Sequence, residues 1–237
     1  MSIRRSAFFA IGLIATTLTA PEPSKERFLR LDWKGGAYRL FVPTAYDGKS
    51  ALPLVLFLHG AAGRGRDNER HLLVGNGMLV EMFAAAEKQF PAFVLAPQTA
   101  SRHGVETTMP VLDDVRARYR IDPSRIYVIG QSLGGYGLID LIDARPQLFA
   151  AAVVIAASGE TSSAKNLAGV PVWFFHGEHD EGVPVEGVRR LASAVKRARG
   201  TVRYTEYPGE GHGLAWLVVK EPELLPWIFA QRRVPGK

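Results

Sequence analysis

The chain has 237 residues, of which 47% are hydrophobic and 22% charged, so it can form one globular domain with a substantial core. This composition excludes a disordered chain, and the absence of cysteine excludes disulfide scaffolds, cysteine-ligated metal clusters and thiol nucleophiles. The 29 basic and 23 acidic side chains give a formal charge of +6, which makes nucleic acid or an anionic surface a partner to consider.

The first twenty residues have the pattern of a secretory signal peptide. Arg4 and Arg5 precede an uncharged run over 6–20 that ends in small residues. This run is shorter than the roughly 20 apolar residues of a membrane-spanning helix. A buried helix and a membrane anchor are the alternatives. We expect residues 1–20 to be removed and the chain to be exported, periplasmic or secreted, with no stable membrane anchor after processing. Removal would lower the formal charge from +6 to +4.

The remaining residues, 21–237, predict a single α/β domain. Residues 28–33 and 37–42 alternate with period two and predict an antiparallel hairpin at a sheet edge. Continuously apolar runs, typical of strands covered on both faces, follow at 54–58, 93–96, 126–129, 151–157 and 172–175. Helical periodicity spans 79–90 and 188–195, residues 202–207 alternate as an edge strand, and a last helix is expected over 223–232, bent or restarted by Pro226.

Strands that alternate with helices in this way predict a mostly parallel sheet with an antiparallel N-terminal edge and helices on both faces. Only about a dozen residues separate the strand that ends near 157 from the one that begins near 170, which is within the usual length of a loop. We therefore expect no cap domain over the site.

The motif Gly130-Gln131-Ser132-Leu133-Gly134 lies between a buried strand and an apolar helix. A G-x-S-x-G sequence in this context predicts a serine nucleophile on a sharp strand-to-helix turn, whose flanking glycines let the backbone close on itself. An ordinary turn serine is the alternative.

A glycine-rich loop, His59-Gly60-Ala61-Ala62-Gly63, follows the strand 54–58. Attack on a carbonyl builds negative charge on oxygen, which needs backbone N–H donors. We expect the N–H groups of Leu133 and Ala61 to supply them. The loop does not match either phosphate-binding glycine motif, and His59 is expected to brace the loop rather than react.

A serine nucleophile also needs a histidine base and a carboxylate that orients it, in the chain order serine, acid, histidine. Ser132, Asp180 and His212 satisfy this order, and Asp180 and His212 each follow a predicted strand. Glu178 and Glu181 are alternatives to Asp180. The segment His176-Gly-Glu178-His179 resembles metal-ligand spacing but has no helical pair of ligands, so we expect no metal. His71 and His103 are expected on the surface.

Basic residues are frequent between 189 and 203, but they alternate with Val188, Leu191 and Val195. This pattern predicts the solvated face of an amphipathic helix, and no aromatic platform accompanies it. We therefore expect no nucleic-acid partner. Arg64, Arg66 and Arg70 lie near the loop 59–63 in the sequence, so a substrate with an acidic edge is an open alternative.

Several co-linear motifs between 28 and 233 resemble the α/β-hydrolase superfamily. They include Pro53-Leu-Val-Leu-Phe-Leu-His-Gly60, Phe93-Val-Leu-Ala-Pro-Gln98, Gly130-Gln-Ser-Leu-Gly-Gly-Tyr136 and Pro171-Val-Trp-Phe-Phe-His-Gly177. Within it, the chain is most similar to the small phospholipase/carboxylesterase-like group, also labelled prolyl-oligopeptidase-type or "predicted peptidase", with feruloyl-esterase and polyhydroxybutyrate-depolymerase relatives. The resemblance implies the α/β-hydrolase fold, a triad of Ser132, Asp180 and His212, and an oxyanion hole at Ala61 and Leu133.

These observations predict a serine carboxylesterase that forms an acyl-enzyme and needs no metal or cofactor. The expected substrate is a small-molecule ester or an ester-bearing polymer, with short or accessible acyl groups. We expect Ala62, Gln131, Val183 and Trp216 to contact it. A serine peptidase with the same triad and a non-catalytic binding protein are the alternatives. Two segments at the substrate rim, 98–103 and 213–216, depart from the family pattern, so specificity is not predicted.

Overall fold

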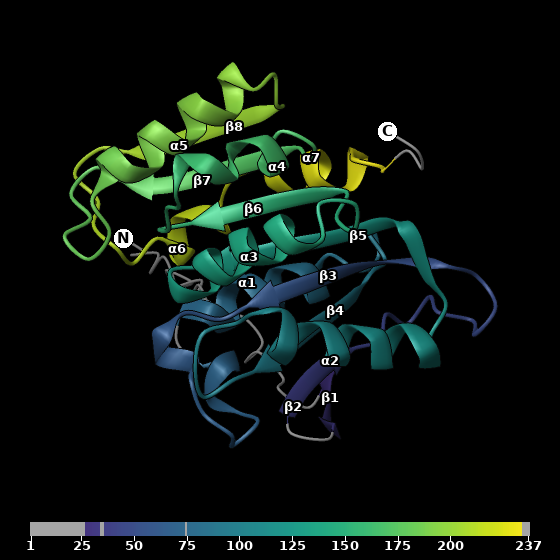
Figure 1. Cartoon of the computed structure of the whole chain (residues 1–237). Helices are drawn as coiled ribbons and strands as arrows, with labels where there is room; N and C mark the ends of the chain where they lie inside the picture. Colours follow the sequence, from purple (N-terminus) through teal and green to yellow (C-terminus); the bar gives the residue numbers. More distant parts are fainter. Residues whose placement is uncertain (1–26, 34–35, 74, 234–237) are drawn as a thin grey trace, which may run out of the picture.

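The computed structural model describes residues 27–33, 36–73 and 75–233, and the predicted signal peptide lies outside them (Figure 1). Within the described residues, eight strands form one open sheet in the order β1-β2-β4-β3-β5-β6-β7-β8. The strands are β1 Phe28–Trp33, β2 Gly36–Phe41, β3 Leu52–Leu58, β4 Phe93–Gln98, β5 Ile121–Gln131, β6 Ala151–Ile155, β7 Val172–Gly177 and β8 Val202–Tyr207.

The first two strands are antiparallel, and all the others are parallel to one another. β2 pairs antiparallel with both β1 and β4, and every pairing from β4 to β8 is parallel. The carboxyl ends of β3, β5, β7 and β8 therefore meet at one edge of the sheet, where ligand sites of open α/β sheets form. The predicted hairpin, parallel strands and edge strand are confirmed.

Helices cover both faces of the sheet (Figure 1). One face carries α2 Val105–Arg118, α3 Leu133–Ala144, α4 Ala164–Leu167 and α5 Val185–Arg197, and the other carries α1 Gly75–Ala85, α6 Ala215–Val218 and α7 Leu224–Ala230. Short 3₁₀ turns occur at Ala61–Gly63, Arg70–Leu72 and Thr161–Ser163.

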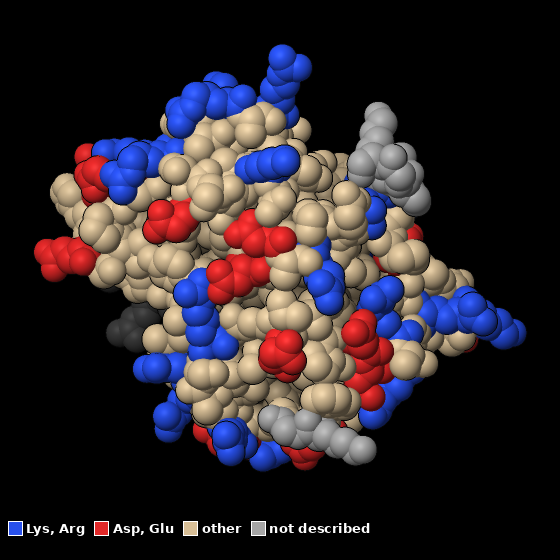
Figure 2. All heavy atoms as spheres, viewed as in Figure 1, with Lys and Arg blue, Asp and Glu red and all other residues tan. Residues whose placement is uncertain are grey.

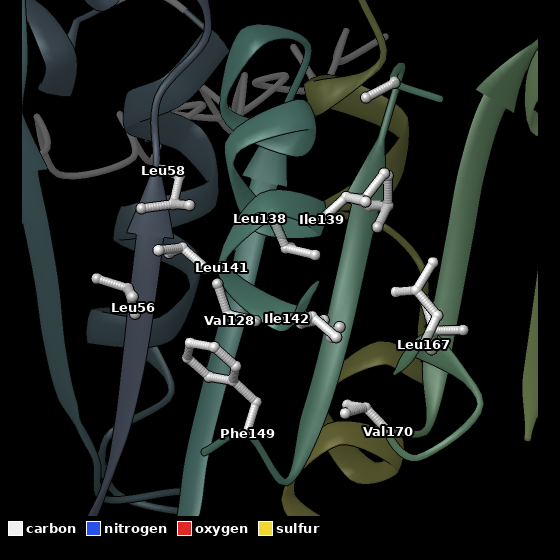
Figure 3. Close-up of a cluster of buried hydrophobic side chains, with 14 of the residues drawn as sticks. Leu56, Leu58, Val128, Leu138, Ile139, Leu141, Ile142, Phe149, Leu167 and Val170 are labelled. Atoms are coloured by element: carbon white, nitrogen blue, oxygen red, sulfur yellow. The ribbon is translucent and has the colours of Figure 1, made fainter. Parts of the chain in front are cut away.

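The alternation of side chains along β3 divides the core in two. Leu56 and Leu58 pack against α3, whereas Val55 and Phe57 pack on the opposite face. Figure 3 shows the first of these cores, where α3 lies over β3, β5 and β6. Each fully buried leucine or phenylalanine contributes about 1.5–3 kcal/mol of transfer free energy. Because such side chains lie on both faces, both cores stabilise the sheet.

The helices match the predictions less closely than the strands do. The helix expected over 79–90 ends at Ala85 and continues as turns. The last helix begins at Leu224, which puts Pro226 in its first turn, where a backbone N–H would have no acceptor within the helix. Sequence reasoning missed α2, because Pro110 and the polar residues around it interrupt the pattern.

The basic residues of α5 lie on its solvent face, as predicted. Arg189, Arg190, Lys196 and Arg197 are exposed, and Val188 and Leu191 are buried. Figure 2 shows lysine and arginine gathered over this helix, at the top of the view. Arg189 is ion-paired with Glu206 on β8.

Charged side chains also accompany both outer strands of the sheet. On β8, Arg203 pairs with Glu223 at 2.6 Å, and its guanidinium lies 4.8 Å from the centre of the Trp173 ring. On β1, Arg30 pairs with Glu69 at 2.8 Å. Exposed pairs of this kind add little to stability.

The turn from β5 into α3 is closed by glycines that touch neighbouring backbone. A Cβ atom on Gly134 would lie 2.0 Å from the carbonyl oxygen of Leu58, and one on Gly130 would lie 2.3 Å from that of Gly134. Real Cβ atoms do not approach oxygen this closely, so β3 and the helix would have to separate.

Gly134→Ala is therefore expected to lower the free energy of unfolding by about 3 kcal/mol, measured by chemical denaturation. Gly104→Ala is the matched control, because nothing lies within 4 Å of a Cβ at that position. Equal stability of the two variants would contradict the close approach at Gly134.

Candidate active site

Ser132 lies at the sharp turn between β5 and α3 in a strained backbone conformation. Its φ is 53° and its ψ is −119°, a region that residues with a side chain rarely adopt. Such a conformation costs about 1–3 kcal/mol and persists only when its surroundings fix it. Here the N–H of Ser132 donates to the carbonyl of Ile155 at 2.8 Å, and its carbonyl accepts from Gly135 N–H at 2.8 Å. The side chain is thereby held beyond the carboxyl end of β5.

Hydrogen bonds connect Ser132, His212 and Asp180, which we call the trio. His212 Nδ1 lies 2.8 Å from Asp180 Oδ2, and His212 Nε2 lies 2.7 Å from Ser132 Oγ. Because an ionised carboxylate only accepts hydrogen bonds, Nδ1 carries the proton and Nε2 accepts from the serine hydroxyl. The three residues predicted from the sequence are thus brought together in the order expected.

The loop after β7 fixes the orientation of Asp180. Its Oδ1 accepts from the N–H groups of Gly182 at 2.9 Å and Val183 at 2.8 Å, and its side chain is buried. Buried His176 donates from Nε2 to the carbonyl of Val183 at 2.8 Å and lies 3.4 Å from Asp180 Oδ2. These contacts hold Oδ2 toward His212.

The alternative acids lie elsewhere. Glu178 accepts from the N–H of Gly209 at 2.9 Å, and both Glu178 and Glu181 are exposed. His179 also has an exposed side chain, whereas His176 is buried against the Asp180 loop. Within the segment 176–179, Glu178 and His179 are therefore exposed to solvent, and His176 supports Asp180.

Two backbone amides are candidates for holding an oxyanion. Ala61 N–H begins the turn Ala61–Gly63, and Leu133 N–H begins α3. The first N–H groups of a helix have no acceptor within it, and no described group accepts from either amide. Leu133 follows Ser132 in the sequence, and Ala61 and Ser132 line the same pocket. Both N–H groups predicted from the sequence therefore lie near Ser132 without a described acceptor.

The loop that carries Ala61 is fixed by side chains from β3 and β4. His59 Nδ1 donates to the carbonyl of Gly60 at 2.8 Å, and its Nε2 accepts from the N–H of Thr99 at 3.2 Å. Gln98 donates to the carbonyl of Gly63 at 3.1 Å and to Asp67 at 2.9 Å. The bracing role expected for His59 is confirmed. The role of Gln98 was missed, although it lies in the Pro-Gln motif.

The prediction that His71 and His103 lie on the surface is wrong. Both are buried beside His59, with ring centres 6.0 Å and 4.3 Å from that of His59. The sequence around them is polar, and only the tertiary packing of loops after β3 and β4 covers them. His71 Nε2 donates to the carbonyl of Ala96 at 3.0 Å.

Burial keeps these three histidines neutral. It lowers the pKa of His59, lowers that of His71 to about 3, with the neighbouring His59 as the second cause, and lowers that of His103 well below its usual value. The hydrogen bonds of His59 require a neutral ring with its proton on Nδ1, because Nε2 is an acceptor. The support of the Ala61 loop therefore depends on unprotonated imidazoles.

A cleft of about 350 Å³ opens beside Ser132 and His212. Small residues, Gly60, Ala61 and Ala62, line it from the β3 loop, and Gln131 and Trp216 also reach it. Of the four predicted substrate contacts, Ala62, Gln131 and Trp216 are therefore on the cleft. Val183 is not among the lining residues, because it is buried and its backbone bonds to Asp180 and His176. Met78, on α1, also lines the cleft, and no pattern in the sequence identified it as a site residue.

A family model for the dienelactone hydrolase family matches residues 38–218, a span that holds every member of the trio. The chain belongs to the dienelactone hydrolase family. This match confirms the resemblance to α/β-hydrolases. The family is one of hydrolases, and the relatives of this chain include esterases.

Individual relatives agree with this family. The crystal structure of a thermostable esterase superposes with a TM-score of 0.82 at 33% identity, covering 88% of this chain and 64% of that one. "Putative esterase NocK" of Nocardia uniformis subsp. tsuyamanensis is 26% identical over 64% of this chain and 47% of its own length. "Uncharacterized peptidase YuxL" of Bacillus subtilis (strain 168) is 23% identical over 74% of this chain and 33% of its own length. This chain therefore spans half or less of the length of both curated relatives.

Among the described residues, no helix is long and apolar enough to cross a membrane.

The buried histidines predict an acid-sensitive fold. Their pKa values are lower in the folded chain than in the unfolded one, so below pH about 6.5 the unfolded chain binds more protons and stability falls. The loss for His71 continues down to its folded pKa of about 3. His71→Gln, whose amide can still donate to Ala96, should reduce the loss of unfolding free energy between pH 7 and pH 5 by about 2 kcal/mol. Urea titrations at both pH values measure this difference, and an unchanged loss would contradict it.

Proposed function

We propose that this chain is a serine carboxylic-ester hydrolase that acts through an acyl-enzyme intermediate. The observation that carries the proposal is the trio itself. A serine hydroxyl donates to a histidine whose other nitrogen is held by a buried carboxylate, at 2.7 and 2.8 Å. Membership of a hydrolase family and the esterase relatives support ester hydrolysis.

In this mechanism Ser132 Oγ attacks the ester carbonyl while His212 Nε2 takes the hydroxyl proton. Asp180 keeps the proton on Nδ1 and stabilises the imidazolium that forms. The N–H groups of Ala61 and Leu133 receive the charge on the tetrahedral oxygen, and each such donor is worth about 3–4 kcal/mol. His212 returns its proton to the leaving alcohol. It then removes a proton from water, whose oxygen attacks the acyl carbon, and it returns this proton to Ser132 Oγ as the bond to the serine breaks and the carboxylic acid leaves.

A serine peptidase with the same trio is the second candidate, because one relative of this chain is named as a peptidase. The open cleft of about 350 Å³ favours esters, since small accessible acyl groups fit it and no extended groove is needed. The substrate is a small-molecule ester or an ester on a larger molecule. The pattern of residues 1–20 supports export of the chain to the periplasm or beyond the cell.

A fluorophosphonate probe is expected to label the protein at Ser132. Ser132→Ala should lose both the labelling and the hydrolysis of 4-nitrophenyl butanoate, with kcat reduced by about 10⁵-fold or more. Ser193→Ala is the matched control, because Ser193 is exposed on α5, and it should keep both. Labelling that persists without Ser132 would overturn the assignment of the nucleophile.

Activity on 4-nitrophenyl esters should be greatest between acetate and hexanoate and fall by at least about tenfold toward palmitate, since a cleft of this size is at the small end for ligands. Parallel assays with peptide 4-nitroanilides test the second candidate. A maximum at palmitate would contradict the small cleft, and faster cleavage of the anilides would replace the esterase with the peptidase.

A further inference from the structure

Two large apolar side chains are exposed on the cleft beside Ser132. Met78 on α1 is 44% exposed and Trp216 on α6 is 43% exposed. Among the described residues, Leu29 at the sheet edge is the other large hydrophobic side chain exposed to this extent. Apolar side chains that gather at a concave site and remain in contact with water are typical of a ligand contact rather than of the core.

Among the described residues that line the same cleft, His212 is the one side chain that can become positively charged. Neither arginine nor lysine is among the described residues that line it. Arg64 donates to the carbonyl of Ala61 and is exposed, and Arg66 lines a different pocket next to Gln98. Lys220 lies 4.9 Å from the centre of the Trp216 ring, where it is not part of the lining.

The ionisable side chain that is hydrogen-bonded to the lining residue His212 is acidic. Asp180 is buried behind His212 and accepts from it at 2.8 Å. While the reacting carbonyl occupies the two backbone amides, a carboxylate on the substituent would give up hydration without gaining an arginine or lysine partner, and it would also be repelled by Asp180. A neutral apolar group would instead cover Met78 and Trp216.

We propose that the cleft selects esters whose substituent in the cleft is neutral and apolar, and that Met78 and Trp216 determine this specificity. The proposal rests on the ester hydrolysis proposed above and names its substrate class. Among the described residues, Arg64, Arg66 and Arg70 are not part of the cleft lining, so this proposal differs from the acidic substrate edge that their positions in the sequence left open.

Matched ester pairs test the charge preference on each half of the substrate. On the acyl side, kcat/KM is compared between 4-nitrophenyl hexanoate and mono-4-nitrophenyl adipate, after subtraction of spontaneous hydrolysis. On the alcohol side, methyl 4-acetoxybenzoate is compared with 4-acetoxybenzoate. For the half that occupies the cleft, we expect the neutral ester to be preferred by at least about tenfold, equal to about 1.4 kcal/mol.

Two substitutions assign the preference to the named residues. Met78→Lys places a cation on the cleft and should reduce the preferred neutral-to-anionic ratio by about tenfold. Leu29→Lys is the matched control, since Leu29 is equally exposed (45%) but lies on β1, and the ratio should stay within about twofold. Trp216→Ala should raise KM for 4-nitrophenyl hexanoate several-fold while leaving that for the acetate within about twofold, because only the longer acyl group reaches the ring.

The outcomes separate this inference from the proposed function. Hydrolysis of neutral and anionic esters at rates within twofold of each other, for both pairs, overturns the charge preference and leaves the esterase intact. A Met78→Lys ratio equal to that of Leu29→Lys overturns the role of Met78. If no ester is hydrolysed and the probe does not label Ser132, the proposed esterase function is overturned, and this inference with it.

Discussion

The site depends on a serine whose backbone is held in a conformation that it would not adopt alone. Ser132 has a positive φ because its N–H is tied to Ile155 on β6, its carbonyl is tied to α3, and Gly134 lets the helix touch β3. The cost of this strain is met by the packing of the central strands. The Ser132 side chain is therefore positioned by the core of the sheet, and not by its own loop.

The residues of the site follow the ends of β3, β5, β7 and β8, and buried polar side chains support two of these loops. His59 and Gln98 fix the loop that carries Ala61, and His176 fixes the loop that carries Asp180. Hydrogen bonds of this kind are strong where water is excluded. The polar residues buried near the site are thus the supports of flexible loops rather than additional reacting groups.

Much of this arrangement could be predicted from the sequence, because its determinants are local. Continuous apolar runs mark the parallel strands, and glycines mark the turns after β3 and β5. The order serine, acid, histidine then identifies Ser132, Asp180 and His212. The positions of His71, His103 and Met78 could not be predicted. They depend on how separate loops and a helix cover one another in space, and no spacing within the sequence records such contacts.

The charged pairs on the outer strands of the sheet affect how two molecules of this protein could associate. An open sheet offers unpaired backbone groups along both borders, and a second sheet could extend it there. Arg203 and its partner Glu223 lie at one border and Arg30 and Glu69 at the other. Joining two sheets would strip water from these ions. Edge-to-edge association of two molecules is therefore opposed at each border by the cost of dehydrating these ion pairs.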